Sequence, residues 1–250
     1  MKILVISDIH GNAEALRAVV KAEPDADHTI FLGDALLSGP QAAEVAELLD
    51  KLNLDIAIMG NHDEELLDPS RFAHWPKEWV ALNEWIIETL DPAVIQSFAD
   101  YQPNGHYELG GLEMYLHHGE LPRGEPQALP DAKDEVFLRL INDQPAPTVL
   151  FGHTHIQFER QVGEQRFINP GSVGQPRCGR LHACYGVFED GLYTPKQVDY
   201  DPTPWLAALD RIDVLSQFPD FKQWLADGLT TGFGIGERAP WTTFAAQGFK

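Results

Sequence analysis

The sequence predicts an α/β fold, because strand and helix patterns alternate at its beginning. Short apolar runs typical of buried strands lie at residues 2–7, 28–32 and 55–59. Between them, residues 13–22 and 41–51 repeat apolar side chains at helical spacing. A β-α-β-α-β order implies parallel strands joined by right-handed crossovers.

Aromatic side chains crowd the stretch that follows, at about 64–104. Residues 77–90 fit an amphipathic helix, and Asp91-Pro92 fits the cap and first position of another. We interpret the stretch as a helical insertion packed over the core. Whether its aromatics form a wall of a substrate pocket or pack as ordinary core stays open at this point.

Strand pairs dominate the second half of the chain. The predicted strands lie at 106–110, 112–117, 147–151, 158–162, 165–168, 181–188 and 192–198, and turn-forming glycines join several of them as hairpins. The predicted helices lie at 131–142, 201–215 and 218–225.

The organisation along the chain favours one domain over residues 1–250. No repeat or linker interrupts it, so the insertion at about 64–104 and a C-terminal helical extension from about 201 are read as parts of that domain. The glycine-rich tail at 228–250 is expected to dock on the body or on a second subunit, which leaves a homo-oligomer as an alternative.

Composition limits the partners. A formal net charge of −20 argues against a long nucleic-acid surface, but bound divalent metals would still allow a small phosphorylated substrate. No apolar run reaches the length of a membrane span, and the N-terminal run is too short for a signal peptide, so we expect a cytoplasmic protein without membrane contact. Cys178 and Cys184 are expected to be free thiols of a reducing compartment.

Five predicted strands end in side chains that bind metals or move protons. In chain order these are Asp8 and His10, Asp34, Asn61 and His62, His118, and His153 and His155. Ligands of open α/β sheets bind at the carboxyl ends of strands, so we expect these groups to converge. Each motif alone is commonly just a polar turn, whereas their joint occurrence indicates a site.

The residue types indicate borderline divalent ions such as Mn, Fe, Zn or Ni. We expect Asp8 and His10 to point the same way along an extended segment, and His153 and His155 likewise. Seven ligands exceed the need of one catalytic ion, whereas two ions about 3.5–4 Å apart that share a carboxylate would use them all.

These motifs resemble the signature of the calcineurin-like metallophosphoesterases: D-x-H at 8–10, G-D at 33–34, G-N-H-D at 60–63, H-G at 118–119 and G-H-T-H at 152–155, in this order. The run N-P-G-S-V-G-Q-P-R at 169–177 resembles the bacterial and archaeal branch of small phosphodiesterases. The resemblance covers residues 1 to about 200 and is weaker over the insertion.

The resemblance implies a four-layer α-β-β-α sandwich of two facing mixed β-sheets. It also implies two metal ions, Mn or Fe first and Zn or Ni as alternatives. One ion would take Asp8, His10 and His155, the other Asn61, His118 and His153, and Asp34 would bridge them. His117 is a second candidate beside His118.

The resemblance further implies a phosphoesterase that hydrolyses a phosphodiester, or a nucleotide phosphoanhydride, of a small substrate through metal-activated water. We expect His62 to be the general acid, or alternatively a residue that only orients Asn61 or the phosphate. Asp63 either orients His62 or caps the next segment. Arg177, and less so Arg123, either binds a phosphate oxygen or is structural.

Two departures from the family's pattern bear on the substrate. Gly33 to Gly39 lacks the Asp-Arg pair of the Ser/Thr protein phosphatases, which disfavours that activity, and Ser38 stands where related enzymes often carry an aromatic. The alternatives to a phosphodiesterase are a phosphomonoesterase of similar mechanism and a catalytically weak metal-binding scaffold.

Overall fold

The computed structural model describes residues 1–52, 54–142 and 144–250. Within these ranges the strands form two five-stranded sheets, ordered β10-β9-β1-β2-β3 and β4-β5-β6-β8-β7. Each sheet mixes parallel neighbours with antiparallel ones.

The first sheet contains strands from both ends of the region that resembles the family, residues 1 to about 200. Its strands are β1 (Lys2–Ile6), β2 (His28–Phe31), β3 (Ile56–Ala57), β9 (Ala183–Glu189) and β10 (Leu192–Val198). The parallel order of β1, β2 and β3 is confirmed. The predicted third strand, 55–59, is longer than β3; Ile58 still donates its N–H to Phe31 O of β2 (2.9 Å) and also forms an isolated bridge with Gln102.

The second sheet consists of β4 (Gly105–Leu109), β5 (Leu112–His117), β6 (Thr148–Phe151), β7 (Gln157–Val162) and β8 (Gln165–Pro170). Strands β4 and β5 pair as a hairpin, and so do β7 and β8, as the sequence predicts. Strands β5, β6 and β8 run parallel, so the carboxyl ends of β5 and β6 lie at one edge.

Alternate side chains of β1 face opposite layers, as the two-residue period of a strand requires. Ile3 and Val5 pack between the sheets against Met114 and Leu116 of β5. Each sheet therefore buries one of its faces against the other sheet.

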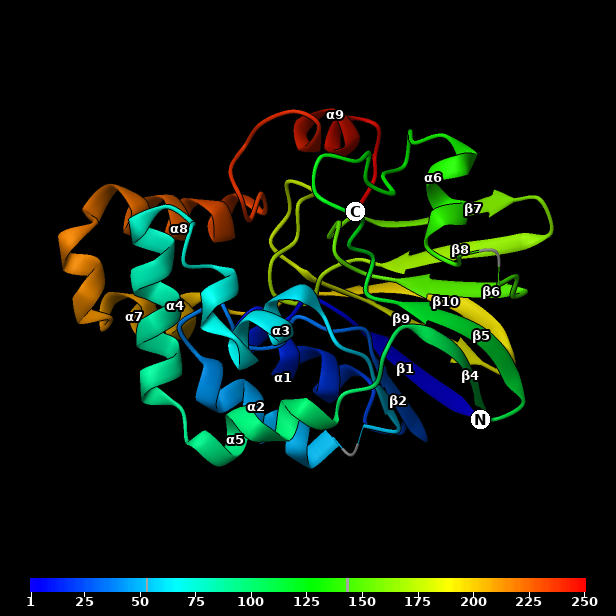
Figure 1. The fold of residues 1–250 in the computed structure, drawn as a ribbon, viewed down its shortest axis with the longest axis horizontal. Helices are drawn as coiled ribbons and strands as arrows, with labels where there is room; N and C mark the ends of the chain where they lie inside the picture. Colours follow the sequence, from blue (N-terminus) through cyan, green and yellow to red (C-terminus); the bar gives the residue numbers. More distant parts are fainter. Residues whose placement is uncertain (53, 143) are drawn as a thin grey trace.

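Helices cover the outer faces of both sheets (Figure 1). Leu4 and Ile6 pack with α1 (Ala13–Ala22) and α2 (Ala42–Leu52). On the other side, α6 (Asp134–Arg139) is shorter than the predicted 131–142, and its Phe137 packs on Phe151 and Phe167. The predicted four-layer α-β-β-α sandwich is confirmed.

The segment between β3 and β4 is helical, with α3 (Asn61–Leu67), η1 (Pro69–Arg71), α4 (Lys77–Thr89), α5 (Pro92–Ser97) and η2 (Phe98–Asp100). The Asp91 side chain accepts a hydrogen bond from the Ala93 backbone N–H, so the predicted cap is confirmed. Phe72 and Phe98 are buried in the core with α1, while Trp75 contacts the His62 ring edge-on. The aromatics therefore serve both as core and as a wall beside His62.

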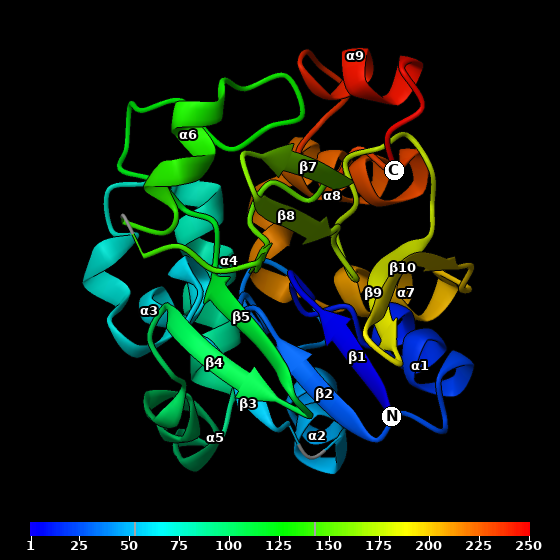
Figure 2. The same ribbon diagram turned by 90° about the vertical axis from the view of Figure 1, so that its right-hand side faces the viewer.

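The chain ends in α7 (Thr203–Asp210), η3 (Asp213–Gln217), α8 (Pro219–Thr231) and α9 (Trp241–Ala246). The prediction of one helix over 201–215 is wrong, because the backbone is extended at Ile212. The tail folds back onto the body (Figure 2). Trp241 and Phe244 join the core around Phe137. Among the described residues, no helix combines the length and apolarity needed to cross a bilayer.

Candidate metal centre

The loops after β1, β2, β3, β5 and β6 bring the predicted ligands together. Three groups of side chains have ligand atoms within 4.8 Å of one another: Asp8, His10 and His155; Asp34, His118 and His153; and His10, Asp34 and His62. All lie at the carboxyl ends of strands, which is where α/β sheets bind ligands.

The first group surrounds the His155 imidazole. Its Nε2 lies 3.2 Å from Asp8 Oδ1 and 3.1 Å from His10 Nε2. These residues come from the loops after β1 and β6, far apart in the sequence.

The second group surrounds Asn61 Oδ1, which lies 3.1 Å from His118 Nε2 and 3.0 Å from His153 Nδ1. Asp34 Oδ2 lies 3.1 Å from His118 Nε2 and 3.8 Å from His10 Nε2. Asp34 thus stands between the two groups, where a shared carboxylate is needed.

The imidazoles fit metal ions, because backbone carbonyls fix their tautomers. Nδ1 of His10 donates to Leu37 O (3.2 Å), Nδ1 of His118 to Leu32 O (2.8 Å), and Nδ1 of His155 to Gln175 O (2.7 Å). A ring that donates through Nδ1 presents the Nε2 lone pair to a metal.

The contact between His10 and His155 tests this fit. With both rings neutral and donating through Nδ1, their Nε2 lone pairs face each other at 3.1 Å, and a cation bound by both nitrogens would relieve the repulsion. Nitrogens bound to one ion at about 2.0–2.1 Å and at a right angle lie about 3 Å apart, which agrees with this spacing.

The backbone at the ligands is left-handed and not extended, so our expectation of extended segments is wrong. The ligands Asp8, His10, Asp34, His153 and His155 have φ of 54°, 45°, 65°, 66° and 59°. Asp and His tolerate this region better than most residues, and such strain concentrates at functional sites. The loops turn each side chain individually, which is why His153 and His155 belong to different groups.

Gly60 shows how closely the loops approach. A Cβ at this position would lie 2.3 Å from Asp34 Oδ1 and 2.6 Å from the Asp34 backbone N. Only glycine lets the loop before Asn61 pass the loop that carries Asp34.

Charges in the centre are strongly coupled. Burial opposes ionisation of Asp8 and Asp34, but the neighbouring imidazoles His155 and His118 hold the pKa of each carboxyl below its ordinary value. Burial lowers the pKa of His10 to about 3, so this ring stays neutral. Burial lowers the pKa of His118, but the charge of Asp34 outweighs it and raises the pKa to about 10, so His118 must release a proton before it can bind a metal, whereas the carboxylates and His10 are already in the binding form.

His62 is held beside the ligands by a residue that the sequence did not single out. Its backbone N–H donates to Asp34 Oδ1 (2.8 Å), and its Nδ1 lies 2.9 Å from Glu65 Oε2, one helical turn along α3. Burial lowers the pKa of His62, but the charge of Asp34 and the contact with Glu65 outweigh it and raise the pKa to about 9. The three-residue spacing on a helix is the signal that could have identified Glu65.

Asp63 caps the segment and does not orient His62. Its carboxylate accepts hydrogen bonds from the backbone N–H groups of Gly60 (2.9 Å), Asp34 (2.8 Å) and Ala35 (3.0 Å). It therefore ties the start of α3 to the loop that carries Asp34.

Arg177 is half-buried at the end of the 169–177 loop. Its guanidinium lies 4.9 Å from the centre of the Trp241 ring and donates to Thr154 O at 3.5 Å. Among the described residues its Nε has no hydrogen-bond partner. The Arg177 side chain therefore stacks on Trp241 beside His153 and His155, and its buried Nε donates to no described residue.

Three further predicted candidates lie elsewhere. His117 accepts a hydrogen bond from the Gly119 N–H through Nδ1 (2.8 Å) and belongs to none of the ligand groups. Arg123 is exposed and donates to His74. Ser38 is buried, and its backbone N–H donates to Asn83 of α4 (3.2 Å).

Comparison with known proteins agrees with this geometry. A family model described as the calcineurin-like phosphoesterase superfamily domain matches residues 1–189. The uncharacterized protein MJ0912 of Methanocaldococcus jannaschii is 30% identical over 221 residues, 80% of this chain and 88% of that protein. The phosphodiesterase YfcE of Escherichia coli K12 is 29% identical over 203 residues, 77% of this chain and 89% of that enzyme.

A solved metallophosphoesterase from Sphaerobacter thermophilus superimposes with a TM-score of 0.68 at 25% identity, covering 91% of this chain and 99% of that one. This superfamily depends on two metal ions, and the Asp/His groups described above could hold them. The chain therefore belongs to the calcineurin-like phosphoesterase superfamily, and it is a metal-dependent phosphoesterase.

Proposed function

We propose that this protein hydrolyses a phosphodiester, or a nucleotide phosphoanhydride, of a small substrate, with two divalent metal ions and with His62 as general acid. The observation that supports it best is the convergence of Asp8, His10 and His155 with Asp34, His118 and His153 in two abutting groups. Asn61 completes the second group through its amide oxygen.

We assign one ion to Asp8, His10 and His155 and the other to Asn61, His118 and His153, with Asp34 shared. Mn or Fe suits this mixed oxygen and nitrogen set, and Zn or Ni is the alternative. Bound there, the ions neutralise phosphate oxygens and lower the pKa of a coordinated water toward ~7, which makes a nucleophile available near neutral pH.

His62 provides the proton for the leaving oxygen. Glu65 holds its Nδ1, which leaves Nε2 to carry the transferred proton, and Trp75 packs on the ring edge-on. A positioned acid of this kind contributes roughly 10²–10⁴ in rate. We also assign Arg177, which stacks on Trp241 beside His153 and His155, to a phosphate oxygen of the substrate.

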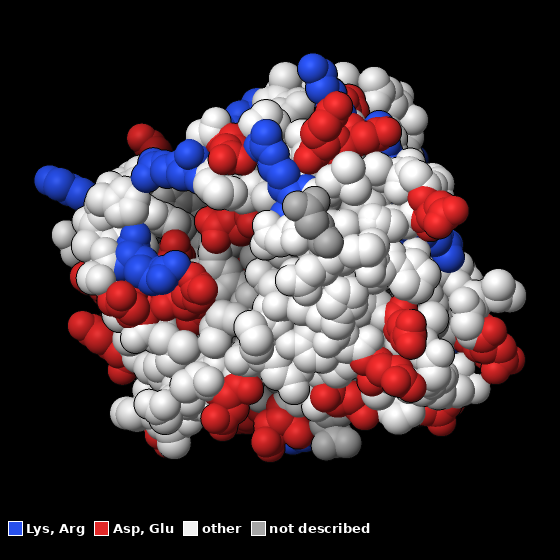
Figure 3. All heavy atoms as spheres, turned by 45° about the vertical axis from the view of Figure 1, so that its right-hand side comes forward, with Lys and Arg blue, Asp and Glu red and all other residues white. Residues whose placement is uncertain are grey.

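The acidic surface supports a small substrate. On the face drawn in Figure 3, acidic side chains stand in separate groups, and the described basic side chains form no continuous band. A long nucleic acid needs such a band for its phosphates. Cys178 and Cys184 form no disulfide, and cysteines kept reduced, whether free or metal-bound, are typical of a reducing compartment such as the cytoplasm.

The decisive experiment starts from metal-stripped protein. Adding Mn²⁺ should restore hydrolysis of bis-p-nitrophenyl phosphate, and turnover of p-nitrophenyl phosphate should stay lower. Asp34→Asn should remain inactive with added metal, because the shared carboxylate is lost. Absence of turnover with Mn, Fe, Zn and Ni sinks the enzymatic proposal, and a preference for the monoester replaces it with a phosphomonoesterase.

A further inference from the structure

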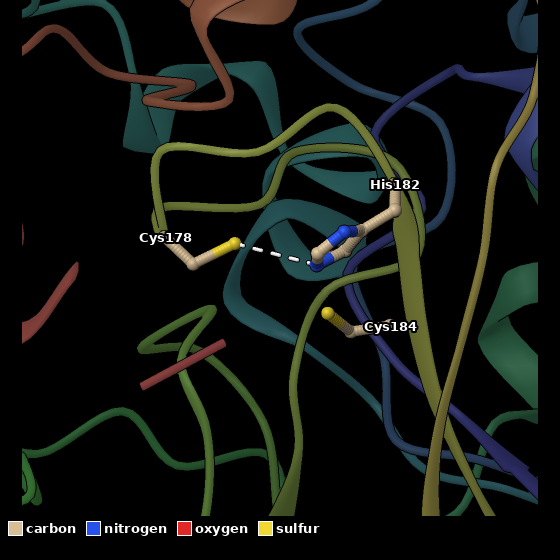
Figure 4. A group of neighbouring side chains, drawn as sticks. All are labelled: Cys178, His182 and Cys184. Carbon is tan, nitrogen blue, oxygen red and sulfur yellow. Dashed lines mark hydrogen bonds between the residues drawn. The ribbon is translucent and has the colours of Figure 1, made fainter. Parts of the chain in front are cut away.

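A second cluster of metal-binding side chains lies outside the centre described above. Cys178, His182 and Cys184 are buried, with 3%, 7% and 0% of their surface exposed. Their ligand atoms all lie within 4.8 Å of one another, and Figure 4 shows the two sulfur atoms and the imidazole turned toward a common space.

The local backbone explains the convergence. Gly179 has φ 72°, which reverses the chain between Cys178 and the start of β9. His182 and Cys184 are two residues apart as the chain enters β9, so their side chains leave on the same face. Ala183 faces the helical layer instead, which leaves Cys184 on the side of the second sheet.

The distances agree with tetrahedral coordination. Cys178 Sγ lies 3.6 Å from His182 Nε2. A zinc ion with Zn–S of about 2.3 Å and Zn–N of about 2.0–2.1 Å holds these two atoms about 3.6 Å apart at the tetrahedral angle. The three side chains therefore need no large movement to share one ion.

The donor set differs from that of the phosphoesterase centre. Two sulfurs and one imidazole favour soft or borderline ions, whereas the centre offers only oxygen and nitrogen.

We propose that Cys178, His182 and Cys184 bind a thiophilic metal ion, Zn²⁺ being the best match, with the fourth position taken by water or another small ligand. Binding displaces the thiol protons of Cys178 and Cys184, which pass to solvent. The site is structural and takes no part in phosphoester hydrolysis.

A metal ion bound by these three side chains would anchor the loop that borders the phosphoesterase centre. In this loop the Gly174 N–H donates to Asp8 O (3.1 Å), Gln175 O accepts from His155 (2.7 Å), and Arg177 directly precedes Cys178. An ion at Cys178 therefore fixes the end of the loop from which Arg177 projects.

Cobalt separates the two sites spectroscopically. Full-length protein, kept reduced and stripped of metal, is titrated with Co²⁺. We expect a near-ultraviolet sulfur-to-cobalt charge-transfer absorption that saturates at about one ion per chain, because only this site offers sulfur. Cobalt binding without that absorption would overturn the proposal.

Matched variants assign the signal. Asp34→Asn should retain the sulfur-to-cobalt absorption while it loses metal at the phosphoesterase centre. Cys178→Ser should lose the absorption and about one equivalent of bound metal per chain. An absorption that survives Cys178→Ser would also overturn the assignment.

A measurement without a cysteine variant covers the case in which Cys178→Ser does not fold. X-ray absorption of Asp34→Asn protein loaded with one equivalent of Zn²⁺ should show two sulfur neighbours at about 2.3 Å. A shell of nitrogen and oxygen alone would contradict the site.

Discussion

His62 has its backbone and its ring tied to two different carboxylates. The backbone N–H donates to Asp34, and the imidazole contacts Glu65. Because Asn61 precedes it in the same helical turn, a proposed metal ligand and the proposed acid are held one residue apart. This arrangement separates holding the metal from moving the proton.

Replacing His62 tests its role as an acid. His62→Ala should lower turnover of an alkyl phosphodiester by about 10²–10⁴, and that of an activated aryl ester much less, because a good leaving group needs no proton. The measurement is kcat for both esters at equal metal content. An equal loss for both esters would instead assign His62 to holding the phosphate.

Glu65 is expected to hold the His62 imidazole in place and to favour its protonated form. Loss of the Glu65 charge should lower the pKa of His62, which stands at about 9 with that contact intact. A general acid works only while protonated, so in Glu65→Gln the alkaline fall of kcat should move to lower pH. The pH–rate profile measures the shift.

Glu64→Gln is the matched control, since Glu64 is its neighbour in the same helix but pairs with Arg71. Its alkaline limb should coincide with that of the parent enzyme. If the two variants give the same profile, Glu65 has no particular link to His62.

The convergence of the proposed ligands could be predicted from residue types, whereas their supporting contacts could not. Asp8, Asp34 and His118 follow strand-like runs, so their convergence is visible in the sequence. The left-handed backbone at Asp8 is not, because it depends on hydrogen bonds to the loop after β2, such as Asp8 N–H to Gly33 O (3.0 Å). Glu65 was missed because a carboxylate on a helix is usually just solvated.

At the scale of elements, α1 is joined to three strands through Glu23. The buried carboxylate of Glu23 contacts Lys2 of β1 (2.7 Å) and Lys196 of β10 (2.8 Å), and it accepts a hydrogen bond from Tyr185 of β9 (2.8 Å). Burial raises the pKa of Glu23, but the hydrogen bonds from Lys196, Lys2 and Tyr185 together outweigh it and lower the pKa.

Glu23→Gln should therefore destabilise the protein in a pH-dependent way. The lowered pKa adds stability above the unfolded value near 4.5, and this stability is lost as the pH falls through the folded value. At pH 7 we expect a loss of about 1–3 kcal/mol in the free energy of unfolding, measured with urea.

The difference between parent and Glu23→Gln should shrink in acid, where both side chains are neutral. Asp25→Asn is the control, because Asp25 pairs with the same Lys2 but is 72% exposed. It should change stability far less. A loss for Glu23→Gln that does not depend on pH would contradict the ionic account.

Element boundaries were predictable where local signals decide them and not where packing does. Helix α1 begins and ends where its apolar spacing indicates. The break between α7 and η3 carries no glycine, and its proline-free sequence reads as helix. The chain turns there because Ile212 and Leu215 are buried in the core with Trp205, which is a tertiary effect.

Across the whole molecule, the formal charge of −20 makes bound cations stabilising. Metal that binds the folded state alone adds about 2.7 kcal/mol at a hundredfold excess over Kd. For a chain of this size we expect Mn²⁺ to raise the Tm of the stripped protein by about 5–10 °C.

Asp34→Asn should lose most of the Mn²⁺ effect on Tm, since Asp34 faces both ligand groups. Asp220→Asn removes the same charge at an exposed position of α8 and should keep the full shift. An equal shift in both variants would mean that Mn²⁺ acts by screening the surface charge.

The pairing of β1 with β9 determines when β1 can gain its second neighbouring strand as the chain is synthesised. Lys2 is paired with Glu189, so during synthesis β1 keeps one edge unpaired until the chain has reached β9. Fragments that stop before Ala183 keep that edge exposed. They also lack β9, the strand that follows the loop whose residues 174 and 175 contact Asp8 and His155. Completion of β9, and not of the first half of the chain, is therefore the earliest stage at which the proposed metal centre can gain its full support.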